Sequence, residues 1–559
     1  MQPYVIVPCS GAEQADEWVR LGVEAQSAGK FADAERHYRN ALRLDPRNFI
    51  ATQNLAVVYA QTGQLNDALL TIERATLWDP APGVAWMNWG LMALEADKID
   101  VALAMARRSL EKEPESVQCQ VALALILGTA GEAKEAVEWY DRIVAKEPTH
   151  PVAGPNGCFV RTLTPALPAE MLAVRTAWYS AHRWRGVSRP NGNHRSGVPL
   201  KVGYVSGDFK RHSAAMIFGS VIFNHDRTVV DPFLYSTLPV EPEKDEWTRK
   251  FLEVAGPNWR DISTYDDDQA ETTIRKDGID ILVDLSGHTN GCRLALFTRK
   301  PAPIQATGWG FAHGTGIPEI DYFFGDPVAV PQDQRQHYAE QVYDLPCIVS
   351  YVPPVDYKLA ATSGLPYHKN GYVTFGTYAR YEKFSPECLA TFAQILERVP
   401  DSRLELKDRA YRRPYSIQRV YEAMPTIAKE RLLFSLDTSH PDHMLSYQRA
   451  DLILDPFPHT GGIVSLEQLY MGVPVLTLYG THPGGRTTSS VLTALGKTDW
   501  IAHSPEEYVE KAVVLSKDPQ GLGLARKTLR EEFLHSPVIT GYAQAVERAY
   551  QAMWSRWSK

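Results

Sequence analysis

The sequence contains no apolar run long enough to cross a membrane. A membrane-spanning helix needs about 20 consecutive apolar residues, and no stretch of the 559 residues approaches that length. The opening residues from Met1 to Cys9 carry no basic segment before their short apolar run, so they do not resemble a signal peptide. These absences predict a cytoplasmic protein with no membrane partner.

Cysteine and excess basic charge are also lacking. The six cysteines are scattered, with no C-x-x-C pair and no histidine spacing of the zinc-site type. This pattern predicts free thiols in a reducing compartment and indicates no metal site. The formal net charge of −8 argues against nucleic acid or an anionic membrane as the main partner.

Two common nucleotide-binding signatures are missing as well. The chain has no Walker-type G-x-x-x-x-G-K-S/T and no G-x-G-x-x-G after a predicted strand, which weakens the ATPase and dehydrogenase hypotheses. The acidic run Asp266 to Asp268 invites a metal-binding interpretation. However, it stands in a polar stretch before a predicted helix, where carboxylates stabilise the helix N-terminus, and the sequence favours that interpretation.

The first 150 residues are a repeat. Prolines recur every 34 residues, which is the tetratricopeptide period, and the residues twelve, eight and five places before them are mostly small or apolar. We therefore expect residues 1–150 to form four helix pairs that stack into a solenoid with a concave groove. The prolines that define the register are Pro46, Pro80, Pro114 and Pro148.

Two asparagines occupy one position of neighbouring repeats. Asn54 and Asn88 lie 34 residues apart, whereas the first and fourth repeats have Arg20 and Ala122 there. A side-chain amide donates to and accepts from a peptide backbone, so the pair predicts a groove for an acceptor protein or peptide. A solvated helix face is the alternative.

Strands and helices alternate from Leu200 onward. We expect a linker with one helix over 151–198, a Rossmann-like half over 199–350, a connector over 351–370 and a second such half over 371–559. The last half should end in a helix over about 541–557. The predicted fold class is thus an α-helical tetratricopeptide solenoid followed by two α/β halves, with a ligand cleft between them at the carboxyl ends of the strands.

Two side chains with suitable chemistry follow predicted first strands. His212 comes just beyond the strand over 201–206, where a neutral imidazole can take a proton from a hydroxyl nucleophile. Lys383 precedes a Ser-Pro helix start after the strand over 372–378, a position suited to neutralising a pyrophosphate leaving group. An exposed or structural histidine and a surface lysine are the alternatives.

The stretch from Asp451 to Gly472 predicts a strand, a proline-broken turn, a glycine pair and a helix. Gly461 and Gly462 let the backbone approach a phosphate at the helix N-terminus, and Glu467 lies where it can accept a ribose hydroxyl. An ordinary strand-to-helix turn is the alternative. His443, just upstream, is expected to stack on a base, and a loop with His313, Gly314 and Thr315 is expected to shape a sugar pocket or a tight turn.

Four segments together resemble one family. They are Val202-Gly-Tyr-Val-Ser-Gly-Asp-Phe, Arg299-Lys-Pro-Ala-Pro-Ile-Gln-Ala, Asp455-Pro-Phe-Pro and Glu467-Gln-Leu-Tyr-Met-Gly-Val-Pro-Val. With the tetratricopeptide repeats, they are similar to the O-GlcNAc transferases of glycosyltransferase family 41, in a bacterial-type form with a short repeat array. The resemblance implies a GT-B fold, UDP-GlcNAc as donor, inversion at the anomeric carbon, serine and threonine acceptors, and neither metal nor cofactor.

The same resemblance implies roles for individual residues. His212 matches an active-site histidine and Lys383 the lysine on the donor diphosphate. The matched donor-binding positions are Arg380, Thr438, Ser439, His440, His443, Gly461, Gly462, Ile463, Val464 and Glu467.

The chain departs from the family pattern at the phosphate-binding turn. Family members commonly carry threonines where this chain has Ile463 and Val464. Three hypotheses follow: an O-GlcNAc transferase, a related N-glucosyl- or O-fucosyltransferase, and a tetratricopeptide scaffold with an inactive catalytic half.

Overall fold

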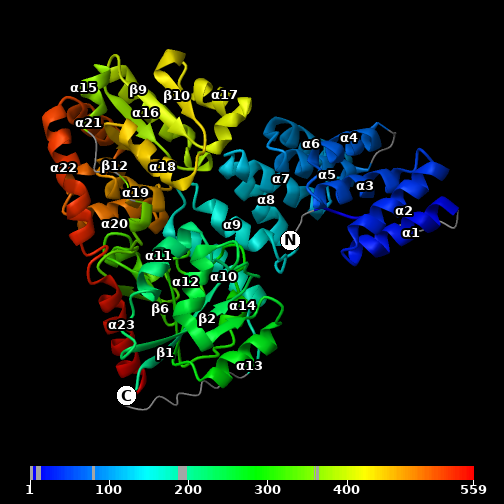
Figure 1. The fold of residues 1–559 in the computed structure, drawn as a ribbon, viewed down its shortest axis with the longest axis horizontal. Coiled ribbons are helices and arrows are strands. Elements are labelled where there is room, and N and C mark those ends of the chain that lie inside the picture. The colour runs from blue at the N-terminus through cyan, green and yellow to red at the C-terminus, as the bar shows by residue number, and fades with distance from the viewer. Residues whose placement is uncertain (1–3, 8–13, 78–81, 187–197, 358, 360–363) are drawn as a thin grey trace. The chain divides into compact units, whose positions relative to one another are not determined.

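The computed structural model describes all residues except 1–3, 8–13, 78–81, 187–197, 358 and 360–363, and Figure 1 draws it as a ribbon. The chain forms two compact units. The first comprises Met1–Ala153 with Arg413–Ser416, and the second Gly154–Arg412 with Ile417–Lys559. No helix in the described ranges is long and apolar enough to span a bilayer.

The first unit consists of helices that pack in consecutive pairs. The residues predicted to lie at helix crossings, such as Ala34, Tyr38 and Ala41, are at most 1% exposed in all four repeats, which confirms the predicted register. Pro46, Pro114 and Pro148 each follow the end of a helix, and Pro80 lies outside the described residues. The helices are α1 (Gln14–Ser27), α2 (Phe31–Leu44), α3 (Phe49–Gln61), α4 (Leu65–Thr76), α5 (Gly83–Glu95), α6 (Ile99–Lys112), α7 (Val117–Thr129) and α8 (Ala133–Lys146).

The second unit contains two parallel sheets. The seven-stranded sheet has the order β3-β2-β1-β4-β5-β6-β7 and the six-stranded sheet the order β10-β9-β8-β11-β12-β13. In each sheet the strand numbers decrease towards one point and increase beyond it, which makes that point the switch point. It lies between β1 and β4 in the first sheet and between β8 and β11 in the second. The strands are β1 (Leu200–Ser206), β2 (Val230–Ser236), β3 (Trp259–Asp261), β4 (Ile281–Asp284), β5 (Ile304–Thr307), β6 (Tyr322–Gly325), β7 (Gln341–Asp344), β8 (Thr374–Thr377), β9 (Arg403–Lys407), β10 (Leu432–Ser435), β11 (Leu452–Leu454), β12 (Val475–Leu478) and β13 (Ile501–Ala502).

Helices cover both faces of these sheets. In the first sheet, Tyr204 packs into one apolar cluster and Val205 into another, as expected for parallel strands that are buried on both sides. The helices are α9 (Ala153–Arg161), α10 (Pro168–His182), α11 (Ser213–Ile222), α12 (Glu246–Ala255), α13 (Asp267–Asp277), α14 (Leu294–Phe297), α15 (Pro366–Asn370), α16 (Pro386–Arg398), α17 (Pro414–Ala423), α18 (His440–Ser446), α19 (Ile463–Tyr470), α20 (Thr487–Ala494), α21 (Pro505–Ser516), α22 (Pro519–His535) and α23 (Tyr542–Trp557).

The last helix joins the two halves of the second unit. Tyr550 Oη of α23 lies 3.1 Å from Tyr204 Oη of β1, and Tyr542 Oη donates to the carbonyl oxygen of Cys347 over 2.8 Å. In Figure 1 the red α23 runs back beside the green first half. One apolar cluster contains residues of both sheets, so the two halves share a core.

Four strands, β2, β3, β7 and β13, show no clear strand pattern in the sequence. β2 contains Pro232, which has no N–H for the ladder, although it pairs in register with Val202 of β1. β3 and β13 have only three and two residues, too few to show a period, and β7 is the last strand of its sheet.

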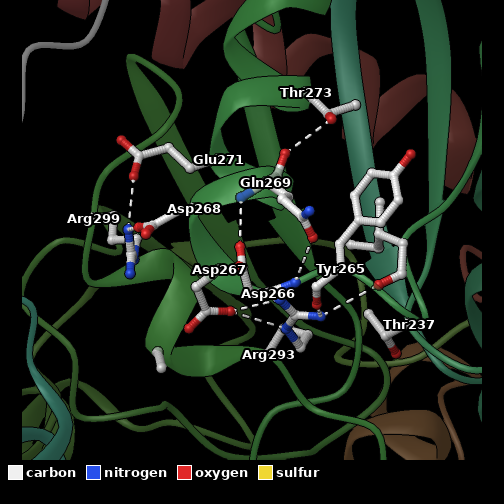
Figure 2. Close-up of polar contacts among 12 residues, drawn as sticks. Thr237, Tyr265, Asp266, Asp267, Asp268, Gln269, Glu271, Thr273, Arg293 and Arg299 are labelled. Atoms are coloured by element: carbon white, nitrogen blue, oxygen red, sulfur yellow. Dashed lines mark hydrogen bonds and ion pairs between the residues drawn. The ribbon is translucent and has the colours of Figure 1, made fainter.

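The acidic run is a helix N-terminus, as the sequence favoured. Asp266 caps α13: its carboxylate accepts from the Gln269 N–H over 2.8 Å, and the Gln269 side chain bonds back to the Asp266 N–H. Arg293 pairs with Asp267 over 2.6 Å, and Arg299 pairs with Asp268. Figure 2 shows both arginines beside the acidic run. The carboxylates are thus committed to the helix end and to two arginines.

Candidate active site

The predicted donor site lies at the switch point of the second sheet. β8 leads into a short 3-10 turn, Tyr381–Lys383, and β11 leads into the loop before α19. Carboxyl ends of adjacent parallel strands meet at one edge of a sheet. Two segments some 80 residues apart in sequence are therefore brought together there, and Lys383 Nζ donates to the carbonyl oxygens of Thr460 and Gly461 over 2.5 and 3.0 Å.

Asp455 holds the loop between β11 and α19 in place through hydrogen bonds. This carboxylate is 1% exposed. Its Oδ1 accepts from the Gly461 N–H over 2.8 Å and from Ser465 Oγ over 3.0 Å, and its Oδ2 accepts from Thr477 Oγ1 over 2.8 Å. Sequence reasoning treated Asp455 only as part of a family motif, because one of its partners, Thr477, lies on a different strand.

The N-terminus of α19 carries no side-chain cap. Gly462 stands before the helix with a φ of 70°, a conformation that glycine adopts without strain. Within the described residues, no group accepts from the N–H groups of Ile463 and Val464. These N–H groups and the positive end of the helix dipole suit an anion, which agrees with the predicted phosphate-binding turn.

Positive charge is concentrated beside this turn. Lys383 is 7% exposed, and burial together with the neighbouring Arg380 lowers the pKa of its ammonium to about 7. Arg380 itself is exposed, and its guanidinium lies 5.8 Å from the centre of the Phe159 ring. Because burial destabilises the charged form of Lys383, a bound anion stabilises the ammonium strongly and keeps the side chain protonated.

A chain of hydrogen bonds surrounds Glu467. Its Oε1 lies 2.7 Å from His440 Nε2, and its Oε2 accepts from Tyr447 Oη over 2.6 Å. His440 Nδ1 in turn lies 2.8 Å from Tyr357 Oη. Each carboxylate oxygen still has a lone pair available, so the geometry is compatible with the predicted ribose contact.

His443 is held by a residue that sequence reasoning missed. Lys407, at the end of β9, donates to Thr438 Oγ1 over 2.9 Å and lies 2.8 Å from His443 Nδ1. Burial and the Lys407 charge lower the pKa of His443 to about 4. The ring is therefore neutral near pH 7, which suits stacking on a base. Ser439 is exposed and caps α18.

His212 is the N-cap of α11, after β1. Its Nδ1 lies 3.3 Å from the Ala214 nitrogen and 3.4 Å from Asp208 Oδ2, and its side chain is 45% exposed. Burial, Lys210 and Arg380 lower the pKa of His212, whereas the Asp208 carboxylate raises it. In the structure Nδ1 accepts from the Ala214 N–H. In the other neutral tautomer the Nδ1 proton points to Asp208 instead of capping the helix, and Nε2 then carries the lone pair that a base needs.

The predicted sugar-pocket residues are all buried, and they differ in whether their polar atoms have partners. Thr315 is fully buried and its hydroxyl donates to Glu340 Oε1 over 2.5 Å, while the Gly314 carbonyl accepts from Arg175. Both residues thus support the loop. His313 Nε2 has no partner among the described residues, so a contribution to the sugar pocket stays a prediction for His313.

A buried histidine cluster adjoins the loop and was not foreseen. His313 lies 5.1 Å from His482 between ring centres, and His459 lies 6.4 Å from His482. A Cβ added at Gly484 would lie 3.1 Å from His313 Nε2 and 3.2 Å from His459 Nε2. Burial lowers the pKa of all three histidines, so they are neutral near pH 7.

The two groove asparagines lie in the first unit, on α3 and α5. Both are fully buried. Their amides bond to the peptide backbone of Val7 and Val5, respectively. The predicted chemistry of Asn54 and Asn88 is therefore present, with a segment of the same chain as the ligand.

Comparison with known proteins identifies the family. A model of "Glycosyl transferase family 41" matches residues 182–349 and 358–545, and two tetratricopeptide models match residues 25–86 and 87–151. The solved structure of a lysine-to-methionine variant of the Thermobaculum terrenum O-GlcNAc transferase has a TM-score of 0.74 at 26% identity. It covers 98% of this chain and 99% of that chain, which supports the predicted solenoid and GT-B fold.

Curated relatives carry related names. The probable UDP-N-acetylglucosamine--peptide N-acetylglucosaminyltransferase SPINDLY of Arabidopsis thaliana is 34% identical over 65% of this chain and 40% of its own length. The corresponding probable enzyme SEC of the same plant is 30% identical over 67% of this chain and 40% of its own length. The chain spans about two fifths of the length of these relatives. It belongs to glycosyl transferase family 41.

Proposed function

We propose that the chain transfers N-acetylglucosamine from UDP-N-acetylglucosamine to serine or threonine hydroxyls of proteins. The observation that carries this proposal is the anion site formed by Lys383 and the uncapped N-terminus of α19. It adjoins Glu467, which is suited to a ribose. The names of the relatives and of the solved structure support the same donor and reaction.

In the proposed reaction, the acceptor hydroxyl attacks the anomeric carbon of the donor. The new C–O bond forms on one face as the bond to the UDP oxygen breaks on the other, so the configuration inverts. His212 Nε2 takes the hydroxyl proton, with Asp208 orienting the imidazole through Nδ1. The electron pair of the broken bond remains on the diphosphate.

Protein groups supply the positive charge for the leaving group in this proposal. Lys383, Arg380 and the N–H groups of Ile463 and Val464 lie around the turn and can stabilise the developing negative charge. We therefore propose a reaction that needs no metal ion. The absence of hydroxyls at positions 463 and 464 leaves the binding to backbone groups and to the two cations.

A lysine substitution tests this proposal. Lys383→Met removes the buried ammonium, and we expect transfer from UDP-N-acetylglucosamine to fall by at least about 100-fold without loss of folding. Lys517→Met, at the exposed end of α21, is the matched control and should leave transfer unchanged. Equal transfer by the two variants would refute the role of Lys383.

The sugar and the location are tested separately. Mass spectrometry of an acceptor after incubation with several nucleotide sugars distinguishes N-acetylglucosamine from a glucosyl or fucosyl product. Calorimetry with UDP addresses the scaffold hypothesis, because an inactive scaffold should bind no UDP. Four of the cysteines are buried free thiols, which supports the proposed cytoplasmic location, and cell fractionation tests it.

A further inference from the structure

The groove of the first unit already contains a peptide. Residues Tyr4–Val7 run in a non-helical conformation beside α3 and α5. The Val5 N–H donates to Asn88 Oδ1 over 3.0 Å, and Asn88 Nδ2 donates to the Val5 carbonyl over 2.8 Å. The Val7 N–H donates to Asn54 Oδ1 over 2.9 Å, and Asn54 Nδ2 donates to the Val7 carbonyl over 2.8 Å.

This arrangement satisfies every backbone group of two alternate residues. In an extended chain, residues i and i+2 present their N–H and C=O groups to the same side. The repeat places the two asparagines at one position of adjacent helix pairs, so each holds one such residue. The segment runs from the third repeat towards the second. Recognition of this kind depends on backbone conformation and tolerates many side chains.

One contact does depend on a side chain. The hydroxyl of Tyr4, one residue before the first held residue, donates to Glu95 Oε2 at the end of α5. Tyr4 is 9% exposed, and burial together with the Glu95 carboxylate raises the pKa of its phenol. The hydroxyl therefore stays protonated and serves as a donor. A phenylalanine in its place leaves this hydrogen bond unmade.

We propose that Tyr4–Val7 is a tethered ligand of the Asn54–Asn88 groove, and that an extended polypeptide from solution binds there only by displacing it. The groove selects a tyrosine directly before the residue whose backbone bonds to Asn88. This inference rests on the proposed function only in equating that polypeptide with the acceptor of the sugar. Binding itself requires neither donor nor catalysis.

The tether makes the competition strong. A covalently attached ligand has an effective concentration that reaches the millimolar range for short linkers, so a free peptide of equal intrinsic affinity competes poorly. Releasing the segment should therefore strengthen the binding of a free peptide by about tenfold or more. The same release should raise the rate of modification of weakly binding acceptors.

Proline substitutions in the full chain test the inference. Val5→Pro/Val7→Pro removes the two backbone N–H groups that donate to the asparagine side chains. Ile6→Pro is the matched control, because among the described residues neither asparagine bonds to the backbone of Ile6. The probe is a fluorescent, end-capped Tyr-Val-Ile-Val peptide, followed by anisotropy. We expect about tenfold tighter probe binding by the double variant than by the wild type or by Ile6→Pro.

Two further measurements separate the possible outcomes. In the wild type, hydrogen exchange of the Val5 and Val7 amides should be slow, and Asn54→Ala/Asn88→Ala should accelerate both. A probe with phenylalanine for tyrosine should bind the double proline variant about tenfold more weakly.

Equal probe binding by all variants, or no binding by the double variant, would overturn the inference. Lys383→Met should bind the probe as the wild type does, so a failure of the proposed catalysis leaves this test intact.

Discussion

The two halves of the second unit hold the loop at their switch points in the same way, but the helices that follow differ in length and in capping. Asp284 ends β4 and accepts from Thr307 Oγ1 on β5 over 2.7 Å. Asp455 follows β11 and accepts from Thr477 Oγ1 on β12 over 2.8 Å. Both carboxylates also accept from N–H groups of the loop that follows. Each therefore ties a loop to the next strand.

The helices that follow differ. After Asp455 comes α19, whose N-terminus carries no side-chain cap. In the first half the loop after Asp284 leads to the four-residue α14, and the longer α11 after β1 is capped by His212 itself. The comparison teaches that a shared topology brings a loop to the same place in each half, whereas the length and the capping of the following helix differ between the halves.

The largest expected effect is on UDP affinity, and it comes from replacing one of the two aspartates but not the other. Asp455→Ala frees the loop that presents Gly461 and the α19 N-terminus, and we expect UDP affinity to fall by about 100-fold, comparable to the loss of a supporting ligand in other sites. Asp284→Ala should change UDP affinity by less than about threefold. Calorimetry with UDP measures both.

Both aspartate variants should lose stability, since each leaves buried donors without an acceptor, at a cost of about 1–3 kcal/mol. Denaturant unfolding checks this cost. Equal losses of UDP affinity in the two variants would contradict the assignment of the donor site to the second half.

A pH dependence is the next largest effect. Lys383 has a pKa of about 7 in the free protein, and a bound diphosphate raises that pKa by its negative charge. Binding therefore takes up a proton above pH 7, and affinity should fall by up to about tenfold per pH unit as the pH rises beyond that value. Calorimetry in buffers of different ionisation enthalpy measures the proton uptake. Lys383→Met should show none, and an unchanged pH slope in that variant would contradict the prediction.

The smallest expected effect tests the proposed role of His212, in the first half, as a base. Asp208 raises the pKa of His212, so Asp208→Asn should shift the acidic limb of the kcat/KM profile to lower pH. It should reduce kcat by a few-fold without changing UDP affinity, because the proposed diphosphate site lies in the other half. Rates at several pH values, with UDP affinity as the control, check it. A loss of UDP affinity with an unchanged pH profile would argue against this role.

Sequence reasoning named candidate site residues, but it did not name the residues that hold them in place. Lys383, Glu467 and the glycine pair were predicted because they lie in short motifs next to recognisable strands. Lys407 was missed, since its contact with His443 joins two different strand ends. β2 was missed because Pro232 obscures its pattern. Local spacing carries no information on contacts of that kind.

The sequence by itself determined the repeat register, the two α/β halves and the residues with suitable chemistry, because helix and strand periods and turn residues are local properties. The tertiary structure decided which of these residues meet. It placed the Lys383 ammonium against the loop held by Asp455, and it paired the hydroxyl of Thr315 with Glu340. It also filled the asparagine groove with the chain's own Tyr4–Val7, since contacts between distant segments follow from packing and from the need to pair buried polar groups.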